Sequence, residues 1–135
     1  MNNRFKTFVG VAILLTAVAA CGQISQQVQA TVPFSFMAGE KRSPAGDCRV
    51  EIDRDRGVIT LSSDTSKIFM LTTSSYQPGD NRSYLRFNRY GDQWFLQAVS
   101  FAGTAEIAPV SKHERELKMA NKSSGGRLIA DIAVH

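Results

Sequence analysis

Hydrophobic and polar residues alternate with a period of two through most of the chain, from Thr31 to about Ala105. Successive side chains of a β-strand point to opposite faces, so this period predicts strands that bury one face. In the run 48–52, for example, Cys48, Val50 and Ile52 alternate with charged residues. Similar runs, rich in β-branched and aromatic side chains, occupy residues 32–36, 58–62, 67–73, 82–90 and 93–102.

Turn-forming residues separate these runs at intervals of roughly 8–15 residues, which is typical of a β-meander. None of the intervals is long enough for the crossover helix that usually joins parallel strands, so antiparallel pairing is expected. The turn signals lie at residues 44–46, 55–57, 62–64, 77–81, 91–92 and 103–104.

One helix is predicted near the C-terminus. Ser111 and Glu114 have the spacing of a capping box, in which the serine caps the helix and the glutamate reaches back to the cap. The helix would end at about Ala120 and pack through Leu117 and Ala120. Because it is short and mostly charged, it requires packing against the rest of the domain to be stable.

The C-terminal residues have two interpretations. The stretch 123–126 reads Ser-Ser-Gly-Gly and ends the helix. Leu128, Ala130, Ile132 and Val134 then occupy alternate positions. This pattern predicts either a final strand that returns to the sheet or a loose tail.

These elements predict an all-β fold with one short C-terminal helix. The expected architecture is a small antiparallel meander of about six to eight strands that closes as a barrel or sandwich. Closure is expected because open edge strands invite pairing with other chains. The β domain with its helix would span residues 31–120, and residues 121–135 would form a linker and tail or the final strand. A chain of 135 residues suits one such domain.

Residues 1–20 have the organisation of a signal peptide. Arg4 and Lys6 precede the uncharged, largely apolar run 8–20, which ends in small residues. This run is shorter than the ~20 apolar residues that a membrane-spanning helix requires. We therefore expect export, with a periplasmic, lipid-anchored or secreted destination.

Two cleavage positions fit this segment. Val18-Ala19-Ala20-Cys21 resembles the lipobox of bacterial lipoproteins, in which the cysteine thiol is diacylated and the cysteine becomes the new N-terminus. The acyl chains would then anchor the protein stably. Val28-Gln29-Ala30 has the small-x-small pattern of ordinary signal peptidase, and cleavage there would release the protein. Lipidation of Cys21, cleavage before Cys21 without lipidation, and cleavage after Ala30 all remain open.

Charge and cysteine content limit the partners of the mature chain. The full chain has 16 basic and 12 acidic side chains, and removal of Arg4 and Lys6 with residues 1–20 leaves a net charge of +2. This charge is too small to indicate a nucleic-acid partner. If Cys21 is acylated or removed, Cys48 is a single thiol that cannot form an internal disulfide. Cys48 occupies an apolar position of the alternating pattern, which predicts a small buried core residue.

Candidate catalytic and metal-binding residues are sparse. Glu51 and Asp53 are expected to share a strand face with Arg49 as a solvated charged surface, although a carboxylate pair for acid–base catalysis would have the same spacing. The segment 53–57 is similar to a calcium loop but contains two arginines and lacks a third oxygen ligand. His113 is expected to be solvated. We therefore expect no enzyme, no cofactor and no metal site.

Several motifs resemble a known family. The segment Val-Pro-Phe-Ser-Phe at 32–36, the Pro-Ala-Gly turn at 44–46 and the Arg-Tyr-Gly-Asp hairpin at 89–92 occur in this order. With the helix at 109–117, the combination is similar to a family of short, exported, functionally uncharacterised proteins of soil bacteria. The resemblance covers roughly residues 31–120. It implies a scaffold, because the shared motifs consist of turn and core residues, and it implies no activity.

The best candidate for a binding face lies on the run 82–90. Arginines between tyrosines can bind a carboxylate, sulfate or sugar through paired hydrogen bonds and stacking. An outward sheet face whose long side chains pair across strands has the same pattern. The alternating residues are Arg82, Tyr84, Arg86, Asn88 and Tyr90.

The expected function is a non-catalytic binding or interaction module of the cell envelope. Its partner would be an envelope component or another protein, and it would contact the membrane only through a lipid anchor. The main alternative is a small β-barrel carrier of an apolar ligand. An enzyme that uses Glu51 and Asp53 is the third hypothesis. The carrier's cavity would be lined by Phe34, Phe36, Phe69, Leu85 or Phe87.

Overall fold

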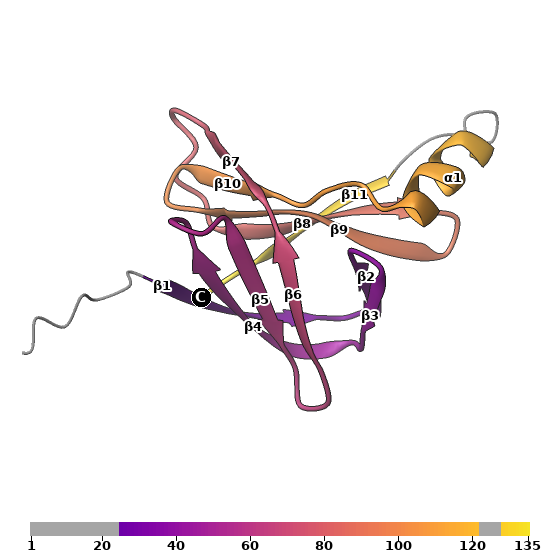
Figure 1. The fold of residues 1–135 in the computed structure, drawn as a ribbon, viewed down its shortest axis with the longest axis horizontal. Helices are drawn as coiled ribbons and strands as arrows, with labels where there is room; N and C mark the ends of the chain where they lie inside the picture. The colour runs from indigo at the N-terminus through magenta and orange to yellow at the C-terminus, as the bar shows by residue number, and fades with distance from the viewer. Residues whose placement is uncertain (1–24, 122–127) are drawn as a thin grey trace, which may run out of the picture.

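The structure, a computed structural model, describes residues 25–121 and 128–135. The expected signal peptide and Cys21 lie outside these ranges. Within them the chain forms 11 strands and one short helix, which confirms the predicted all-β class (Figure 1). No helix in the described ranges is long and apolar enough to cross a membrane.

The first sheet has four antiparallel strands in the order β1-β4-β5-β6. The predicted alternation is clearest in β4, where Cys48, Val50 and Ile52 are buried and the residues between them face outward. The strands are β1 (Ser25–Val32), β4 (Gly46–Asp53), β5 (Val58–Ser62) and β6 (Lys67–Leu71).

The second sheet has the order β11-β8-β9-β10-β7, and a short β2–β3 hairpin joins it along β9. β2 runs parallel to β9 at the pairs Phe36–Trp94 and Met37–Phe95, so the expectation of purely antiparallel pairing is wrong here. The pairing needs no crossover helix because the strands from β3 to β8 connect β2 to β9 along the chain. The strands are β2 (Phe36–Ala38), β3 (Lys41–Ser43), β7 (Thr73–Tyr76), β8 (Tyr84–Tyr90), β9 (Gln93–Phe101), β10 (Thr104–Ile107) and β11 (Leu128–Ala133).

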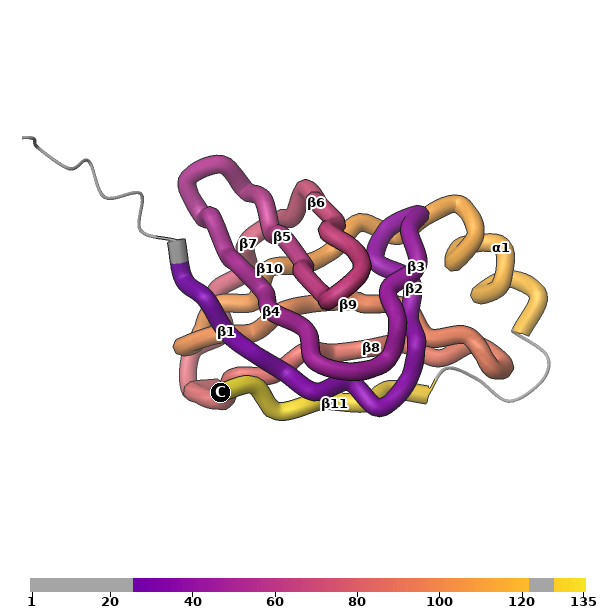
Figure 2. The backbone as a smooth tube through the Cα atoms, turned by 90° about the horizontal axis from the view of Figure 1, so that it is seen from below, coloured from indigo at the N-terminus to yellow at the C-terminus, as the bar shows by residue number. Residues whose placement is uncertain are grey.

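Two connections curl the sheets around one core (Figures 1 and 2). On one side β6 continues into β7 through Thr72, whose amide donates to the Gly57 carbonyl at 2.8 Å. On the other side the backbones of Gln29 and His135 exchange two hydrogen bonds of 3.0 and 2.9 Å, which join β1 to the C-terminal end of the chain. The result is a small barrel-like sandwich, as predicted.

The N-terminal strand begins at Ser25, six residues before the expected start of the domain at Thr31. Val28 and Ala30 are 3% and 2% exposed, so this segment belongs to the core. The strand expected over 32–36 is interrupted instead, because β1 ends at Val32 and β2 begins at Phe36. Pro33 lies in this break, where its missing amide donor breaks no ladder.

The C-terminal elements confirm one alternative and correct another expectation. β11 pairs with β8, so residues 128–133 form the final strand. Helix α1 (Lys112–Ala120) begins as predicted, with the Ser111 hydroxyl accepting from the Glu114 amide at 3.1 Å. The predicted contact residues are wrong, because Ala120 is exposed, Leu117 is only half-buried, and the buried residue of the helix is Glu114.

Candidate functional site

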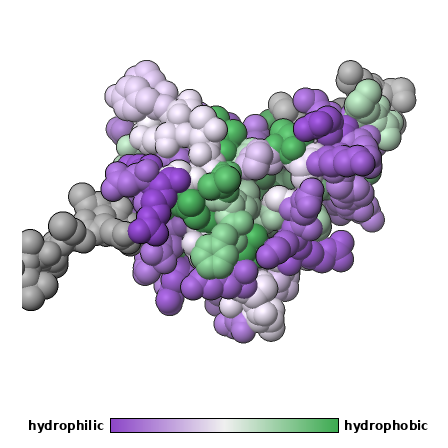
Figure 3. Space-filling view, viewed as in Figure 1, coloured by the Kyte–Doolittle hydropathy of each residue, from purple (hydrophilic) through white to green (hydrophobic). Residues whose placement is uncertain are grey.

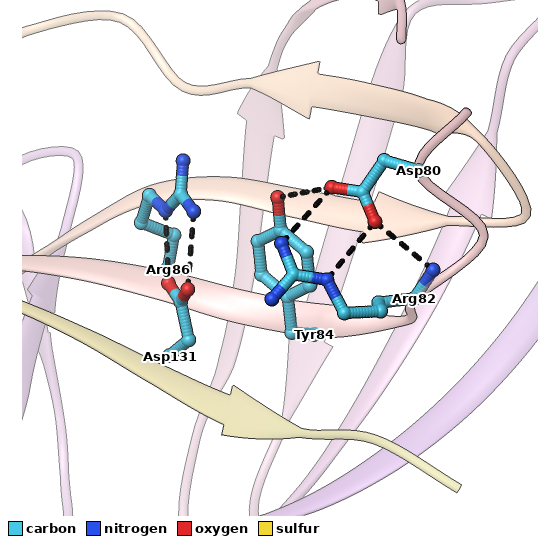
Figure 4. Close-up of polar contacts among 5 residues, drawn as sticks. All are labelled: Asp80, Arg82, Tyr84, Arg86 and Asp131. Carbon is cyan, nitrogen blue, oxygen red and sulfur yellow. Dashed lines mark hydrogen bonds and ion pairs between the residues drawn. The ribbon is translucent and has the colours of Figure 1, made fainter. Parts of the chain in front are cut away.

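The predicted binding face lies on the outer side of β8 and just before it (Figure 4). Both neighbouring guanidinium groups lie over the Tyr84 ring, with Cζ of Arg82 at 5.2 Å and Cζ of Arg86 at 5.0 Å from its centroid. These distances are within the range of cation–π attraction. The period-two pattern therefore placed these three side chains on one face correctly.

Each of these arginines has its own carboxylate. Arg82 donates through Nε and Nη2 to the two carboxylate oxygens of Asp80 at 3.1 and 3.2 Å. Arg86 donates in the same paired manner to Asp131, which stands opposite it on β11, at 2.8 and 3.0 Å. The sequence analysis did not identify either carboxylate as a partner.

The ion pairs neutralise the predicted anion-binding face. Hydrogen bonds from Arg82 hold the pKa of Asp80 below its usual value, and the carboxylates of Asp80 and Asp131 raise the pKa values of Arg82 and Arg86. Each arginine is thus matched by one carboxylate, and the charges of the two ion pairs sum to zero. An external anion would have to displace a carboxylate from a bidentate pair, so the arrangement favours cross-strand pairing over an anion site.

Asn88 and Tyr90, the remaining members of the predicted face, lie beneath α1 rather than with the arginines. Each is 4% exposed. Asn88 Nδ2 donates to Glu114 Oε1 at 3.4 Å, and the Tyr90 hydroxyl donates to the same oxygen at 3.5 Å. The Glu114 carboxylate thus points to the sheet instead of back to the helix cap, and only half of the predicted capping box is present.

The candidate carboxylate pair shares one face of β4, and His113 lies on a different element. Glu51 and Asp53 are on the outer side of β4, and Asp53 accepts from the Arg56 amide at 3.2 Å. His113 is exposed on α1, where its Nε2 lies 2.9 Å from Gln93 Oε1. In the described part of the chain no three His, Cys, Asp or Glu side chains form a group that could hold a metal ion.

Cys48 is a buried core residue, as predicted. Its side chain belongs to the hydrophobic cluster and the residue is 3% exposed. Burial raises the pKa of the thiol to about 11. A thiol in this state is a poor nucleophile, because the thiolate is the reactive form.

A buried carboxylate that the sequence analysis missed joins the two sheets. Glu106 of β10 is 1% exposed and accepts from Ser74 Oγ at 2.8 Å and Thr72 Oγ1 at 3.1 Å. Arg54, in the turn between β4 and β5, places its Nε 3.5 Å from Glu106 and donates from Nη2 to the Phe101 carbonyl at 3.0 Å. This cluster ties the first sheet to β7, β9 and β10.

Most of the residues expected to line a carrier cavity pack against other side chains. Phe36, Leu85 and Phe87 are at most 1% exposed and pack in the core, with the rings of Phe36 and Phe87 4.9 Å apart. Phe34 stacks on the Trp94 ring at 4.1 Å. Phe69 faces outward. None of these side chains lines the cavity beside β1 and β4, the cavity beneath α1 or the cavity between Met37 and α1.

The outer face of the first sheet changes from polar at β1 to apolar at β6. Phe69 and Leu71 are 64% and 72% exposed. Figure 3 shows a group of hydrophobic side chains over β5 and β6 on this side of the molecule. Two cross-strand rows end in this group: Gln27–Glu51–Thr60–Phe69 and Ser25–Asp53–Val58–Leu71.

The chain matches no protein-family model, no curated protein and no solved structure. The resemblance to exported soil-bacterial proteins therefore stays a prediction from its motifs.

Proposed function

We propose that this protein is a non-catalytic interaction module of the cell envelope. It is anchored through an acylated Cys21 and binds an extended segment of a partner protein along β6. The observation that carries the proposal is the exposed apolar edge of the first sheet. Glu51 and Asp53 share the outer face of β4, and His113 lies apart from them on α1, an arrangement that supports a role in binding rather than catalysis.

β6 is an edge strand that presents both backbone groups and apolar side chains. It pairs with β5 on one side, and no other described strand pairs with its second side. Proteins usually protect such edges with charges, proline or a bulge, because a free edge accepts a further strand. Between Lys67 and Leu71 only the first residue is charged. An exposed apolar edge that lacks these protections is typical of a site where a partner adds a strand.

The basic side chains near β6 limit which partner segments fit this edge. Lys67 lies with its Nζ 5.5 Å from the Phe69 centroid, and no described carboxylate is within ion-pair distance of it. Arg49 lies in the same cross-strand row as Lys67, two strands away. The segment that fits this edge is therefore apolar at the positions that meet Phe69 and Leu71 and acidic at the end that meets Lys67.

The position of β1 supports processing before Cys21. Cleavage after Ala30 would remove Ser25–Ala30, with two core residues and the backbone pair between Gln29 and His135. Cleavage before Cys21 leaves the strand intact. Only residues 22–24 then separate the acylated cysteine from β1, and three residues span at most about 11 Å. An anchor at Cys21 would thus hold the domain close to the membrane surface.

Site-specific photo-crosslinking in the cells of origin tests the binding edge. A photoreactive residue replaces Phe69 in one chain and Gln27 in the control chain, because Gln27 is exposed on the same face and in the same row but on the opposite side of the sheet. We expect Phe69 to capture one recurring partner peptide, apolar with an acidic end, and Gln27 to capture none. The additional change Leu71→Lys should abolish capture.

Two outcomes would contradict the proposal. Identical capture patterns at positions 69 and 27 would show that the β6 edge has no specific partner. Capture of a second copy of this chain alone would assign the edge to self-association instead.

A further inference from the structure

A small cavity lies between α1 and the outer face of the second sheet. Its volume is about 230 Å³. Asn88 of β8 and Gln97 of β9 form its floor, Glu114 and Lys118 of α1 form one wall, and Ile107 and Val110 supply apolar surface. It lies on a different sheet from β6, so an argument about its ligand is independent of the proposed function.

Two carbonyl oxygens in this cavity have no hydrogen-bond partner among residues 25–121 and 128–135. These are Asn88 Oδ1 and Gln97 Oε1, and both atoms are buried. The Asn88 amide is oriented by its Nδ2, which donates to Glu114 Oε1 and leaves the carbonyl oxygen available. Native proteins hold few buried acceptors without a partner, because leaving a buried acceptor unpaired costs free energy. Two in one cavity therefore indicate a ligand that brings donors.

The two charged side chains that line the cavity define that ligand further. The Glu114 carboxylate is 4% exposed and lines the same cavity as the two carbonyl oxygens. Three acceptors, one of them anionic, match the three N–H donors of a primary ammonium group. Lys118 disfavours a bare metal ion and instead suits a carboxylate. The apolar surface of Ile107 and Val110 suits a short hydrocarbon group.

We infer that this cavity binds a free α-amino acid with a small apolar side chain. The ligand's ammonium group donates to Asn88 Oδ1, Gln97 Oε1 and the Glu114 carboxylate, and its carboxylate pairs with Lys118. The small volume agrees, because pockets for drug-sized ligands usually measure about 300–1,000 Å³.

Titration of the mature chain with three related probes tests the inference. The probes are L-valine, isobutylamine, which lacks the carboxylate, and isobutyrate, which lacks the ammonium group. Amide chemical shifts report binding. We expect L-valine to bind at least about tenfold more tightly than either analogue, because each analogue loses a charge-assisted contact.

Three variants separate the roles of the lining residues. Gln97→Met should weaken L-valine and isobutylamine by about tenfold alike. Lys118→Met, on the exposed side of α1, should weaken L-valine and leave isobutylamine unchanged. Gln93→Met is the matched control, since Gln93 lies on the same strand but contacts His113 outside the cavity, and it should change neither affinity.

Several results would overturn the inference. These are the absence of saturable shifts with L-valine, equal affinity for L-valine and isobutylamine, or equal weakening by Gln93→Met and Gln97→Met. Saturable binding of calcium chloride that competes with L-valine would assign the oxygens to an inorganic cation. If Gln97→Met does not fold, the Lys118→Met variant decides the question, because it should weaken L-valine and leave isobutylamine unchanged.

Discussion

At the scale of single residues, a carboxylate on the surface and a carboxylate in the interior contribute differently to the stability of the fold. Asp131 lies 34% exposed against Arg86, whereas Glu106 is 1% exposed among two hydroxyl donors and Arg54. Exposed ion pairs contribute about 0–1 kcal/mol, because water already solvates both charges. Removal of one buried partner is more costly, because the groups left behind remain desolvated.

Glu106→Ala should therefore lower the free energy of unfolding by about 3 kcal/mol or more, whereas Asp131→Ala should lower it by about 1 kcal/mol or less. Urea denaturation of both variants provides the measurement. Similar losses in the two variants would mean that the Glu106 cluster does not join the sheets as described.

The buried thiol gives a second residue-scale prediction. With a pKa of about 11, Cys48 is about one part in a thousand thiolate at pH 8, and the core covers it. A disulfide reagent should leave the native mature chain unmodified and react fully once it is unfolded in guanidinium. Rapid, complete labelling of the native chain would contradict the buried position.

The same shift predicts the effect of alkaline pH. The folded state holds the thiol proton more tightly than the unfolded state, whose pKa is near the usual 9.0. The resulting stabilisation is present below pH 9 and is lost as pH rises toward 11. Cys48→Ala should therefore lose less stability than the unmodified chain between pH 9 and 11, as urea unfolding across this range would show.

At the scale of elements, the period-two pattern predicted strands that bury one face. It did not predict strand boundaries that depend on which sheet a segment joins. β4 and β5 were predictable from alternation, whereas β8 and β9 were predictable from their aromatic and β-branched residues, because both of their faces are partly buried. β1 was missed because its glutamines hid the short apolar row of Val28, Ala30 and Val32. The run 67–73 divides at Thr72 because β6 and β7 join different sheets, which no local pattern encodes.

The assignment of β1 to the domain is testable by truncation. A chain that begins at Thr31 should fail to fold cooperatively, because it lacks two core residues and most of the pairing with β4. A chain that begins at Cys21 should fold. Near-ultraviolet circular dichroism with urea unfolding distinguishes them, and an unchanged unfolding midpoint in the shorter chain would contradict this account of β1.

The residues of the candidate sites were likewise predictable only in part. Arg82, Tyr84 and Arg86 were predictable as one face because they alternate on one strand. The role of Asp131 was not, because it depends on the register between β8 and β11, 45 residues apart in the Arg86–Asp131 pair. Glu106 also escaped prediction, since a buried polar residue in a strand has the sequence pattern of an outward-facing one.

At the scale of the whole molecule, closure depends on the last strand. β11 pairs with the edge of β8 that would otherwise be free, and its Ile132 packs against the hydrophobic core. The chain then continues to His135, whose backbone pairs with that of Gln29. A chain that ends at Asn121 should therefore expose two strand edges and form oligomers, because unprotected edges pair with one another. Light scattering during size-exclusion chromatography checks this, and a stable monomer would contradict it.

The central claim is that the folded domain begins just after an acylated Cys21 and is held at the envelope by it. The intact mass of the protein extracted from the envelope of its own cells tests this most directly. We predict a chain that begins at Cys21 and carries the added mass of its acyl groups. A chain that begins at Thr31 would contradict the claim, because it would lack most of β1 and have no anchor.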